Sequence, residues 1–133
     1  MFLGILPGLK HANPDETSIT FWGIQDDDSV WRHVISAFQT AYPYILVEYT
    51  RLPEQTYEQT ILNALARGTG PDLFVLKNEW IVKHRDKVYP LLPDAGFSAV
   101  EFAATFPDGL TEDLVMEDGS IVGLPIFVDT PLL

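Results

Sequence analysis

The stretch from Gly68 to Leu76 places the strongest constraint on how this chain can fold. It follows a segment whose apolar residues recur at helical spacing, and Gly68 is a natural residue to end that helix. Pro71-Asp72 comes next, and then Leu73-Phe74-Val75-Leu76 is apolar at every position, which is typical of a strand covered on both faces. A helix that stops just before a buried strand indicates an α/β protein with a largely parallel sheet.

The residues before this stretch extend the pattern to β-α-β-α-β. Residues 19–22 predict a first strand, and apolar residues at helical spacing between Val30 and Tyr42 predict a helix with Asp28 as its N-cap. Residues 45–49 alternate like a second strand, and residues 57–65 predict a second helix. Because both helices are long enough to be crossover connections, we expect parallel strands joined by right-handed connections.

The signals after Leu76 are weaker. Residues 78–87 predict a helix with Trp80 and Ile81 turned inward. Ser98-Ala99-Val100-Glu101 has the spacing of a capping box, which predicts a short helix to about residue 105. Glu117-Asp118-Gly119-Ser120 predicts a hairpin turn between strands at 114–116 and 121–124.

Composition and charge exclude several classes of protein. The 133 residues are 47% hydrophobic and 20% charged, which is typical of a globular domain. The formal net charge is −11 and the last basic residue is Lys87, so the chain lacks the basic footprint that a nucleic-acid partner requires. The absence of cysteine excludes disulfides, thiolate metal sites and a cysteine nucleophile.

The first 18 residues form a separate segment, apolar from Met1 to Leu9 and polar after Lys10. It lacks the basic start of a secretory signal and the length of a membrane span. Two interpretations remain, an ordinary flexible terminus or the end of a truncated signal or anchor segment. We favour the second because so apolar a run has no evident use in a soluble chain.

The loops that leave the carboxyl ends of the predicted strands are where a ligand of an open parallel sheet would bind. Aromatic, carboxylate and amide side chains gather there, and they suit a polyhydroxylated ligand such as a sugar, because rings stack on its C–H faces while acidic oxygens accept from its hydroxyls. A structural role is the alternative to ligand binding for these residues: tryptophans are more often core residues, and an aspartate cluster is more often a helix cap. The candidate residues are Trp22, Gln25, Asp26, Asp27, Arg51, Asn78, Glu79 and Trp80.

No catalytic constellation emerges from the sequence. The histidines His11, His33 and His84 have no metal-ligand spacing, and a Gly-x-Ser-x-Gly elbow is missing. Gly68-Thr69-Gly70 precedes a strand, whereas phosphate-binding and dinucleotide-binding loops follow one. The sequence therefore predicts no enzyme, cofactor or metal site.

In order and spacing, these motifs resemble the first lobe of the family 1 extracellular solute-binding proteins of ABC importers, the group that includes maltose-binding protein. The resemblance covers about residues 19 to 133. The matching pieces are Ile19-Thr20-Phe21-Trp22-Gly23, Ala41-Tyr42-Pro43, the strand at 45–49, Gly70-Pro71-Asp72-Leu73-Phe74 and Gly119-Ser120-Ile121-Val122-Gly123-Leu124-Pro125.

The resemblance implies a periplasmic-binding-protein-like α/β lobe, mostly parallel and incomplete, that binds a solute outside the cytoplasm for ABC-type import. The solute would be a sugar, the partners permease subunits, and the location the periplasm or cell surface. By similarity, the ligand contacts fall on the loop at 25–27, on Asn78 to Trp80, and on Asp129 and Thr130, whereas Asp72 is expected to be structural.

Members of this family are usually several times longer, so the resemblance also implies that this chain is a fragment or truncated product without its second lobe. A lone lobe is expected to bind sugar weakly or not at all, since half of the cleft is missing. Two other interpretations stay open, a small Rossmann-like enzyme domain and a non-functional remnant. The sequence identifies neither the solute nor the mode of export.

Overall fold

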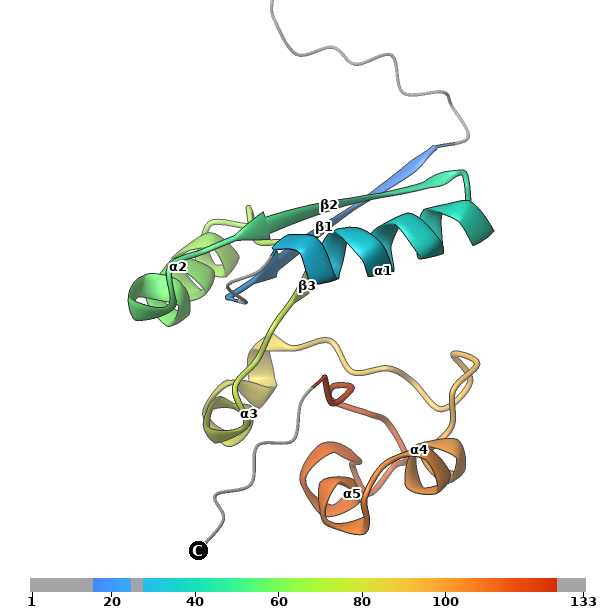
Figure 1. The fold of residues 1–133 in the computed structure, drawn as a ribbon. Helices are drawn as coiled ribbons and strands as arrows, with labels where there is room; N and C mark the ends of the chain where they lie inside the picture. Colours follow the sequence, from blue (N-terminus) through green and yellow to red (C-terminus); the bar gives the residue numbers. More distant parts are fainter. Residues whose placement is uncertain (1–15, 25–27, 127–133) are drawn as a thin grey trace, which may run out of the picture. The chain divides into compact units, whose positions relative to one another are not determined.

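β1 (Thr17–Gly23) is the central strand of a three-stranded parallel sheet with the order β2-β1-β3 (Figure 1). The computed structural model describes residues 16–24 and 28–126, and contacts divide the chain into two units, Met1–Val75 and Leu76–Leu133. The first unit contains the sheet with α1 (Asp28–Ala41), β2 (Ile45–Arg51), α2 (Glu54–Ala66) and β3 (Leu73–Phe74). The second contains α3 (Asn78–His84), the 3-10 turn η1 (Arg85–Lys87), α4 (Ala99–Thr105) and α5 (Asp108–Leu114).

The predicted β-α-β-α-β order and the parallel sheet are confirmed. β1 pairs with β2 in parallel over seven positions, from Thr17 opposite Ile45 to Gly23 opposite Arg51. On its other edge β1 pairs in parallel with β3 at only two positions, Phe21 opposite Leu73 and Trp22 opposite Phe74.

The side chain of Asp72 extends the pairing between β1 and β3 by one position, just before β3 begins. Asp72 Oδ2 accepts hydrogen bonds from the Thr20 N–H (2.8 Å) and the Thr20 hydroxyl (2.7 Å), and that hydroxyl accepts in turn from the Asp72 N–H (3.0 Å). The carboxylate thus occupies the place of a strand carbonyl one register position before Leu73. The hydrogen bonds from the Thr20 backbone and side chain hold the pKa of Asp72 below its ordinary value. The structural role expected for Asp72 is confirmed.

The end of α2 follows the glycine signal in the sequence. Gly68 has φ +68°, its N–H donates to the Leu65 carbonyl, and the Thr69 N–H donates to the Ala64 carbonyl, which together form a Schellman motif. Two residues later the backbone of Gly70 lies against Leu65, since a Cβ there would be 2.6 Å from Leu65 Cδ2. Gly68 therefore ends the helix, and Gly70 lets the backbone that follows pass close to Leu65.

The strand predicted at 73–76 is shorter and less buried than expected. β3 covers only Leu73 and Phe74, and the side chain of Leu73 is 53% exposed, whereas Val75 is buried. The prediction of a strand covered on both faces was wrong, because the side chain of Leu73 is left open. β3 is also an edge strand, with β1 as its only partner among the described residues. An unbroken apolar run does not distinguish an edge strand from a central one.

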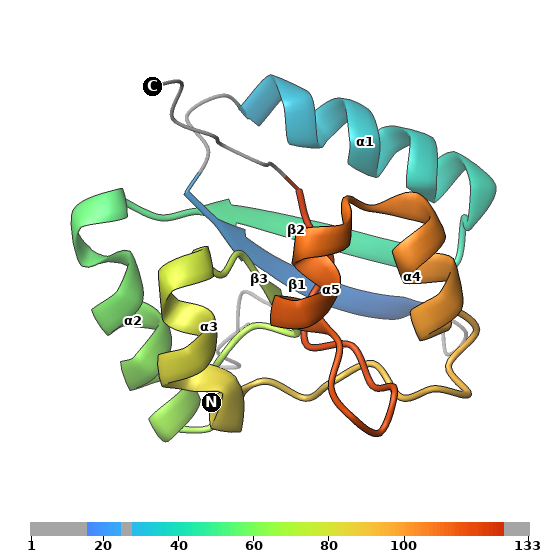
Figure 2. The same cartoon turned by 90° about the horizontal axis from the view of Figure 1, so that it is seen from below.

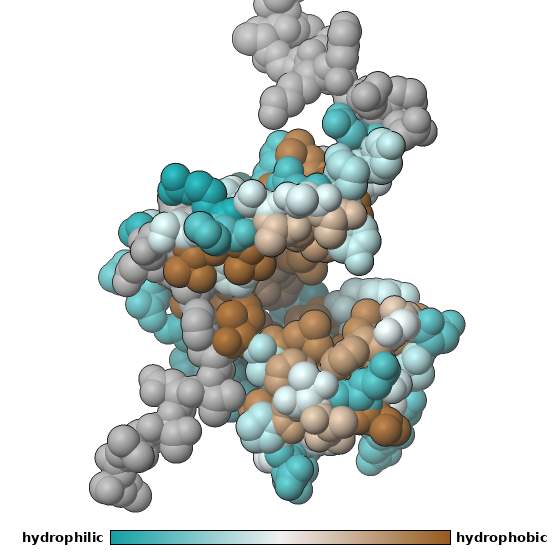
Figure 3. All heavy atoms as spheres, turned by 45° about the vertical axis from the view of Figure 1, so that its right-hand side comes forward, coloured by the Kyte–Doolittle hydropathy of each residue, from teal (hydrophilic) through white to brown (hydrophobic). Residues whose placement is uncertain are grey.

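The apolar stripe of α1 is only partly covered. α1 contacts β2 and runs along it (Figure 2), with Trp31 and Ile35 half-buried. The row Val30, Val34 and Tyr42 stays more than half exposed. Figure 3 shows apolar side chains reaching the surface in both units.

The second unit has its own small core. Its centre is Phe102, which is fully buried, with four other buried residues around it: Ile81, Leu114, Ile121 and Val122. The predicted helix at 78–87 is α3 followed by η1, with Ile81 buried as expected and Trp80 only half-buried. The three helices α3, α4 and α5 and the segment at 121–122 thus share one cluster, which is built from residues of this unit alone.

The capping box that begins α4 is confirmed. The Glu101 N–H donates to Ser98 Oγ (3.3 Å), and the Ser98 N–H donates to Glu101 Oε2 (2.7 Å), so two backbone donors of the first turn are satisfied reciprocally. The Ser98 N–H and the Ser98 hydroxyl both donate to the Glu101 carboxylate, and these two bonds hold the pKa of that carboxyl below its ordinary value.

The predicted hairpin at 114–124 has its turn but not its strands. Gly119 has φ +83°, and its N–H donates to the Met116 carbonyl, as in a tight turn. Leu114 belongs to α5, however, and the flanking residues form only single antiparallel bridges, of Ile121 with Val115 and with Leu91. The strand prediction was wrong because burial of Leu114 in the helical core outweighs pairing over so short a span.

We expect Asp72→Asn to flatten the acid dependence of unfolding. A carboxyl whose pKa is lowered in the folded state contributes stability above its ordinary pKa of 3.8 and loses that contribution as pH falls through the folded value. Urea unfolding between pH 7 and pH 2 measures the effect, and Asp94→Asn, at an exposed loop carboxylate, is the control. An equally steep acid transition in Asp72→Asn would count against the carboxylate as a strand partner.

Loss of the capping box should destabilise the second unit. We expect Ser98→Ala to lower the free energy of unfolding by about 1 kcal/mol, since an N-cap hydroxyl and its reciprocal partner are lost. Val100→Ala, at a 79% exposed position of the same helix, leaves the cap intact and is the control. Urea unfolding followed by circular dichroism compares them, and equal midpoints for the two variants would refute the cap's contribution.

Candidate functional site

The carboxyl ends of the three parallel strands lie at one edge of the sheet in the first unit. Gly23 lies opposite Arg51, and Trp22 opposite Phe74. The pairing continues one residue further, because the Val75 N–H donates to the Trp22 carbonyl at 3.0 Å. Ligands of open α/β sheets bind beyond this edge, so the chain segments that leave it are the candidate site.

Three aromatic rings fasten α1 to the sheet near this edge. Phe21 of β1 meets Trp31 of α1 edge to face, with centroids 4.6 Å apart, and lies 5.1 Å from the ring of Tyr49 of β2. The rings of Trp31 and Tyr49 are 5.7 Å apart. Such pairs contribute about 0.5–1.5 kcal/mol each beyond burial of area, so the cluster stabilises the start of α1 against β1 and β2.

Gly23 leaves the space that Tyr49 occupies. A Cβ at Gly23 would lie 2.7 Å from the Tyr49 hydroxyl oxygen and 2.9 Å from Cε2 of the ring. The Tyr49 side chain therefore reaches along the sheet to the last residue of β1, and a larger residue at position 23 would displace it.

Two predicted site residues lie within the described part of the first unit. Arg51, the last residue of β2, is exposed. The other is Trp22, the next-to-last residue of β1. It is half-buried, and since successive residues of a strand point to opposite faces, it lies on the face opposite Phe21 and the aromatic cluster. Gln25, Asp26 and Asp27, the other predicted residues of this unit, lie outside the described residues.

Asn78, Glu79 and Trp80 form the first turn of α3 in the second unit. Asn78 and Glu79 are exposed, and Trp80 is half-buried with the Lys77 ammonium 5.4 Å from its ring centroid, a cation–π distance. Asp129 and Thr130 lie outside the described residues. The assembly of all these residues with Trp22 into one site stays a prediction.

Sequence reasoning missed Tyr49 and Tyr57 as residues of the carboxyl edge. Tyr57 lies in α2 and is 1% exposed. Its hydroxyl donates to carbonyls of β1 and of the residue after β3, which are 35 and 18 positions away in the sequence. No local pattern indicates partners so distant, whereas the alternation of β2 could have placed Tyr49 near the end of its strand.

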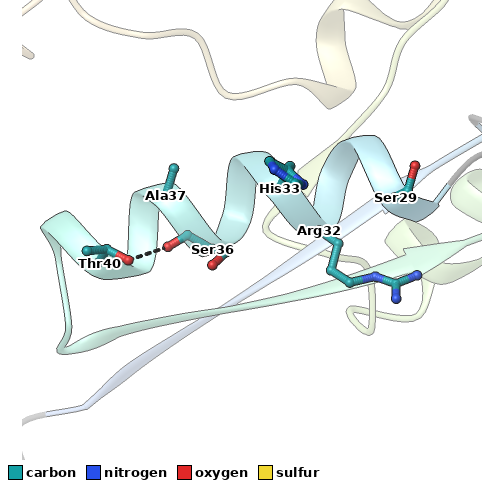
Figure 4. Close-up of a pocket in the computed structure, with 6 residues that line it drawn as sticks. All are labelled: Ser29, Arg32, His33, Ser36, Ala37 and Thr40. Atoms are coloured by element: carbon teal, nitrogen blue, oxygen red, sulfur yellow. Dashed lines mark hydrogen bonds between the residues drawn. The ribbon is translucent and has the colours of Figure 1, made fainter.

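The outer face of α1 carries an open hollow (Figure 4). Its lining side chains recur at helical spacing along this one helix, and Thr40 donates to the Ser36 carbonyl at 2.8 Å. The lining residues are Ser29, Arg32, His33, Ser36, Ala37 and Thr40. The hollow is part of an exposed polar helix face, and none of its residues was predicted to bind a ligand.

Two further properties concern only residues 16–24 and 28–126. Within these ranges, no group of three or more His, Asp or Glu side chains is arranged to hold a metal ion. None of the helices there is long and apolar enough to cross a membrane.

The solved structures similar to this chain that we describe are all solute-binding proteins. Neither a family model nor a curated protein matches the sequence. Among solved structures, the chain is similar to the galacto-N-biose-/lacto-N-biose I-binding protein of an ABC transporter from Bifidobacterium longum, solved with lacto-N-biose, with a TM-score of 0.66 and 15% identity over 85% of this chain and 29% of that one.

Two other similar structures come from different bacteria. An ABC substrate-binding protein from Listeria monocytogenes, solved with cycloalternan, gives a TM-score of 0.65 and 18% identity over 79% of this chain and 28% of that one. A family 1 extracellular solute-binding protein from Alicyclobacillus acidocaldarius gives 0.63 and 20% identity over 80% and 27%.

The chain has the α/β fold of a solute-binding-protein lobe. The fold expected from the resemblance is confirmed by these matches and by the parallel β2-β1-β3 sheet. The chain spans between 27% and 29% of the length of these three proteins. At identities of 15–20% the likeness establishes the fold, and the ligand is a separate question.

We expect Gly23→Ala to destabilise the first unit by about 1–3 kcal/mol, because the added Cβ must displace the ring of Tyr49 from its packed position. The control is Gly109→Ala in α5, where an added Cβ meets no heavy atom within 4 Å and alanine favours the helix. Urea unfolding measures both, and a Gly23→Ala variant as stable as Gly109→Ala would show that Tyr49 is not held against β1.

Proposed function

We propose that this chain is the first lobe of an extracytoplasmic solute receptor for ABC-type import, and that its solute is a carbohydrate. The observation that carries the proposal is the fold likeness to solute-binding proteins, two of which were solved with the sugars lacto-N-biose and cycloalternan. The partners of such a receptor are a small-molecule sugar and the permease subunits that accept it. Its activity is binding, without catalysis.

The chemistry of the proposed ligand residues supports a carbohydrate. Trp22 and Trp80 offer half-buried rings that can stack on the C–H faces of a sugar, and Asn78 and Glu79 are exposed amide and carboxylate groups that can bond its hydroxyls. We include Gln25, Asp26, Asp27, Asp129 and Thr130 in the proposed site on the strength of the resemblance.

One lobe supplies one wall of the cleft that encloses the solute in a closing receptor. Enclosure removes water and strengthens every polar contact, so a single lobe should bind much more weakly than a complete receptor. We expect dissociation constants for this chain in about the millimolar range, which corresponds to roughly −4 kcal/mol.

Titration of the 133-residue chain with a sugar panel that includes lacto-N-biose tests the proposal, with tryptophan fluorescence and calorimetry as readouts. We expect a saturable response that Asn78→Ala weakens by about tenfold, the cost of an unpaired polar group on the ligand. Asn63→Ala, an exposed position of α2 in the first unit, is the matched control and should bind like the unchanged chain.

The outcomes separate the parts of the proposal. Binding of a polyamine or metal ion, with no response to any sugar, would refute the carbohydrate assignment. Equal loss of affinity in Asn63→Ala and Asn78→Ala would refute the proposed site, and absence of any solute response would refute the receptor function of this chain.

A further inference from the structure

The Tyr57 hydroxyl lies between two backbone carbonyls at the carboxyl edge of the sheet. It is 2.9 Å from the Val75 oxygen and 3.0 Å from the Trp22 oxygen, and the side chain is 1% exposed. Tyr57 itself belongs to the first turns of α2, so this contact joins the helix to two strands that are neighbours in the sheet.

The hydroxyl completes the hydrogen bonding of the Val75 peptide groups. The Val75 N–H donates to the Trp22 carbonyl, and the Val75 carbonyl accepts from Tyr57. The Trp22 carbonyl, with two lone pairs, accepts from both donors. Trp22 of β1, Tyr57 of α2 and Val75, the residue after β3, thus form one hydrogen-bonded unit, in which a single phenolic proton is shared by two carbonyls.

A buried hydroxyl is unfavourable unless it is bonded, and filling the space needs no hydroxyl. Phe102, the fully buried ring of the second unit, fills its core without one. Burial raises the pKa of Tyr57, so its hydroxyl stays protonated and able to donate. The hydroxyl is therefore best explained by the two carbonyls that it holds.

These carbonyls lie where the chain leaves the sheet toward the proposed ligand residues. Trp22 is itself one of them and is followed by the last residue of β1, and Asn78 comes three positions after Val75. The hydrogen bonds on these two peptide groups restrain the point and the orientation from which each segment starts, and the φ/ψ angles of the residues that follow determine its further course.

We propose that Tyr57 is a positioning residue of the solute site, whose hydroxyl holds the Trp22 and Val75 carbonyls and thereby sets how the two ligand-bearing segments leave the sheet. Its part in solute binding rests on the proposed function, whereas the clamp on the two strands stands on the geometry alone. Tyr57 need not touch the solute.

The test compares Tyr57→Phe with the unchanged chain by amide hydrogen exchange and by sugar titration. We expect the Val75 amide to exchange about tenfold faster in Tyr57→Phe, because the Trp22 carbonyl that accepts from this amide is no longer held by the Tyr57 hydroxyl. The Leu52 amide, which donates to the Gly23 carbonyl at the same edge without contact to the hydroxyl, should be unchanged and reports any global loss of stability. Affinity for the sugar should fall by about tenfold.

Tyr89→Phe is the matched control, since it removes the hydroxyl of a tyrosine that is 85% exposed, and both readouts should stay unchanged. Unchanged Val75 exchange in Tyr57→Phe would overturn the clamp. Faster Val75 exchange with unchanged sugar affinity would overturn the positioning role and leave Tyr57 a structural residue.

Failure of the proposed function gives a different result. If neither protein binds a sugar while Val75 exchange is selectively faster in Tyr57→Phe, the receptor function is refuted and the clamp is supported. Equal acceleration at Val75 and Leu52 would indicate a general loss of stability and would overturn the selective clamp.

Discussion

The hydrogen bonds along the two edges of β1 hold the first unit together. On the β2 side the ladder runs over seven positions, but on the other side β3 supplies only two. Two side chains extend that short pairing: the Asp72 carboxylate bonds the Thr20 backbone before β3 begins, and the Tyr57 hydroxyl bonds the Trp22 and Val75 carbonyls after it ends. Asp72 thus provides the Thr20 N–H with an acceptor, and Tyr57 provides a donor to the buried Val75 carbonyl, where an unpaired group would be costly.

This arrangement explains how a very short strand can still define the carboxyl edge of the sheet, from which the proposed ligand residues follow. The Tyr57 hydroxyl and the aromatic cluster around Phe21 restrain opposite faces of β1 near its carboxyl end, through α2 and α1 respectively. Rigid support beneath loops is what a binding site requires, because disorder in the free protein subtracts from the affinity. Such support is what the proposed receptor function would require of the first unit, and the proposal itself rests on the chain's fold likeness to solute-binding proteins.

The second unit is organised differently, by short helices around Phe102 rather than by a ladder. The capping box of Ser98 and Glu101 begins α4, and the turn at Gly119 returns the chain so that Ile121 and Val122 join the core. Asp118 accepts from the Ser120 N–H (2.9 Å) within that turn and also from the Ser120 hydroxyl. These bonds hold the pKa of Asp118 below its ordinary value. Local hydrogen bonds therefore replace strand pairing in this part of the chain.

The sequence by itself determined what short-range forces decide. The helix end at Gly68, the capping box at Ser98 and the order of strands and helices in the first unit follow from dihedral preferences, capping and apolar periodicity, all of which act within a few residues. The tertiary structure alone decided that β3 is a short edge strand, that Leu114 joins a helix, and that Tyr57 bonds residues 35 and 18 positions away. Those outcomes depend on which elements contact each other in the folded chain. Local sequence patterns do not show which distant residues come into contact.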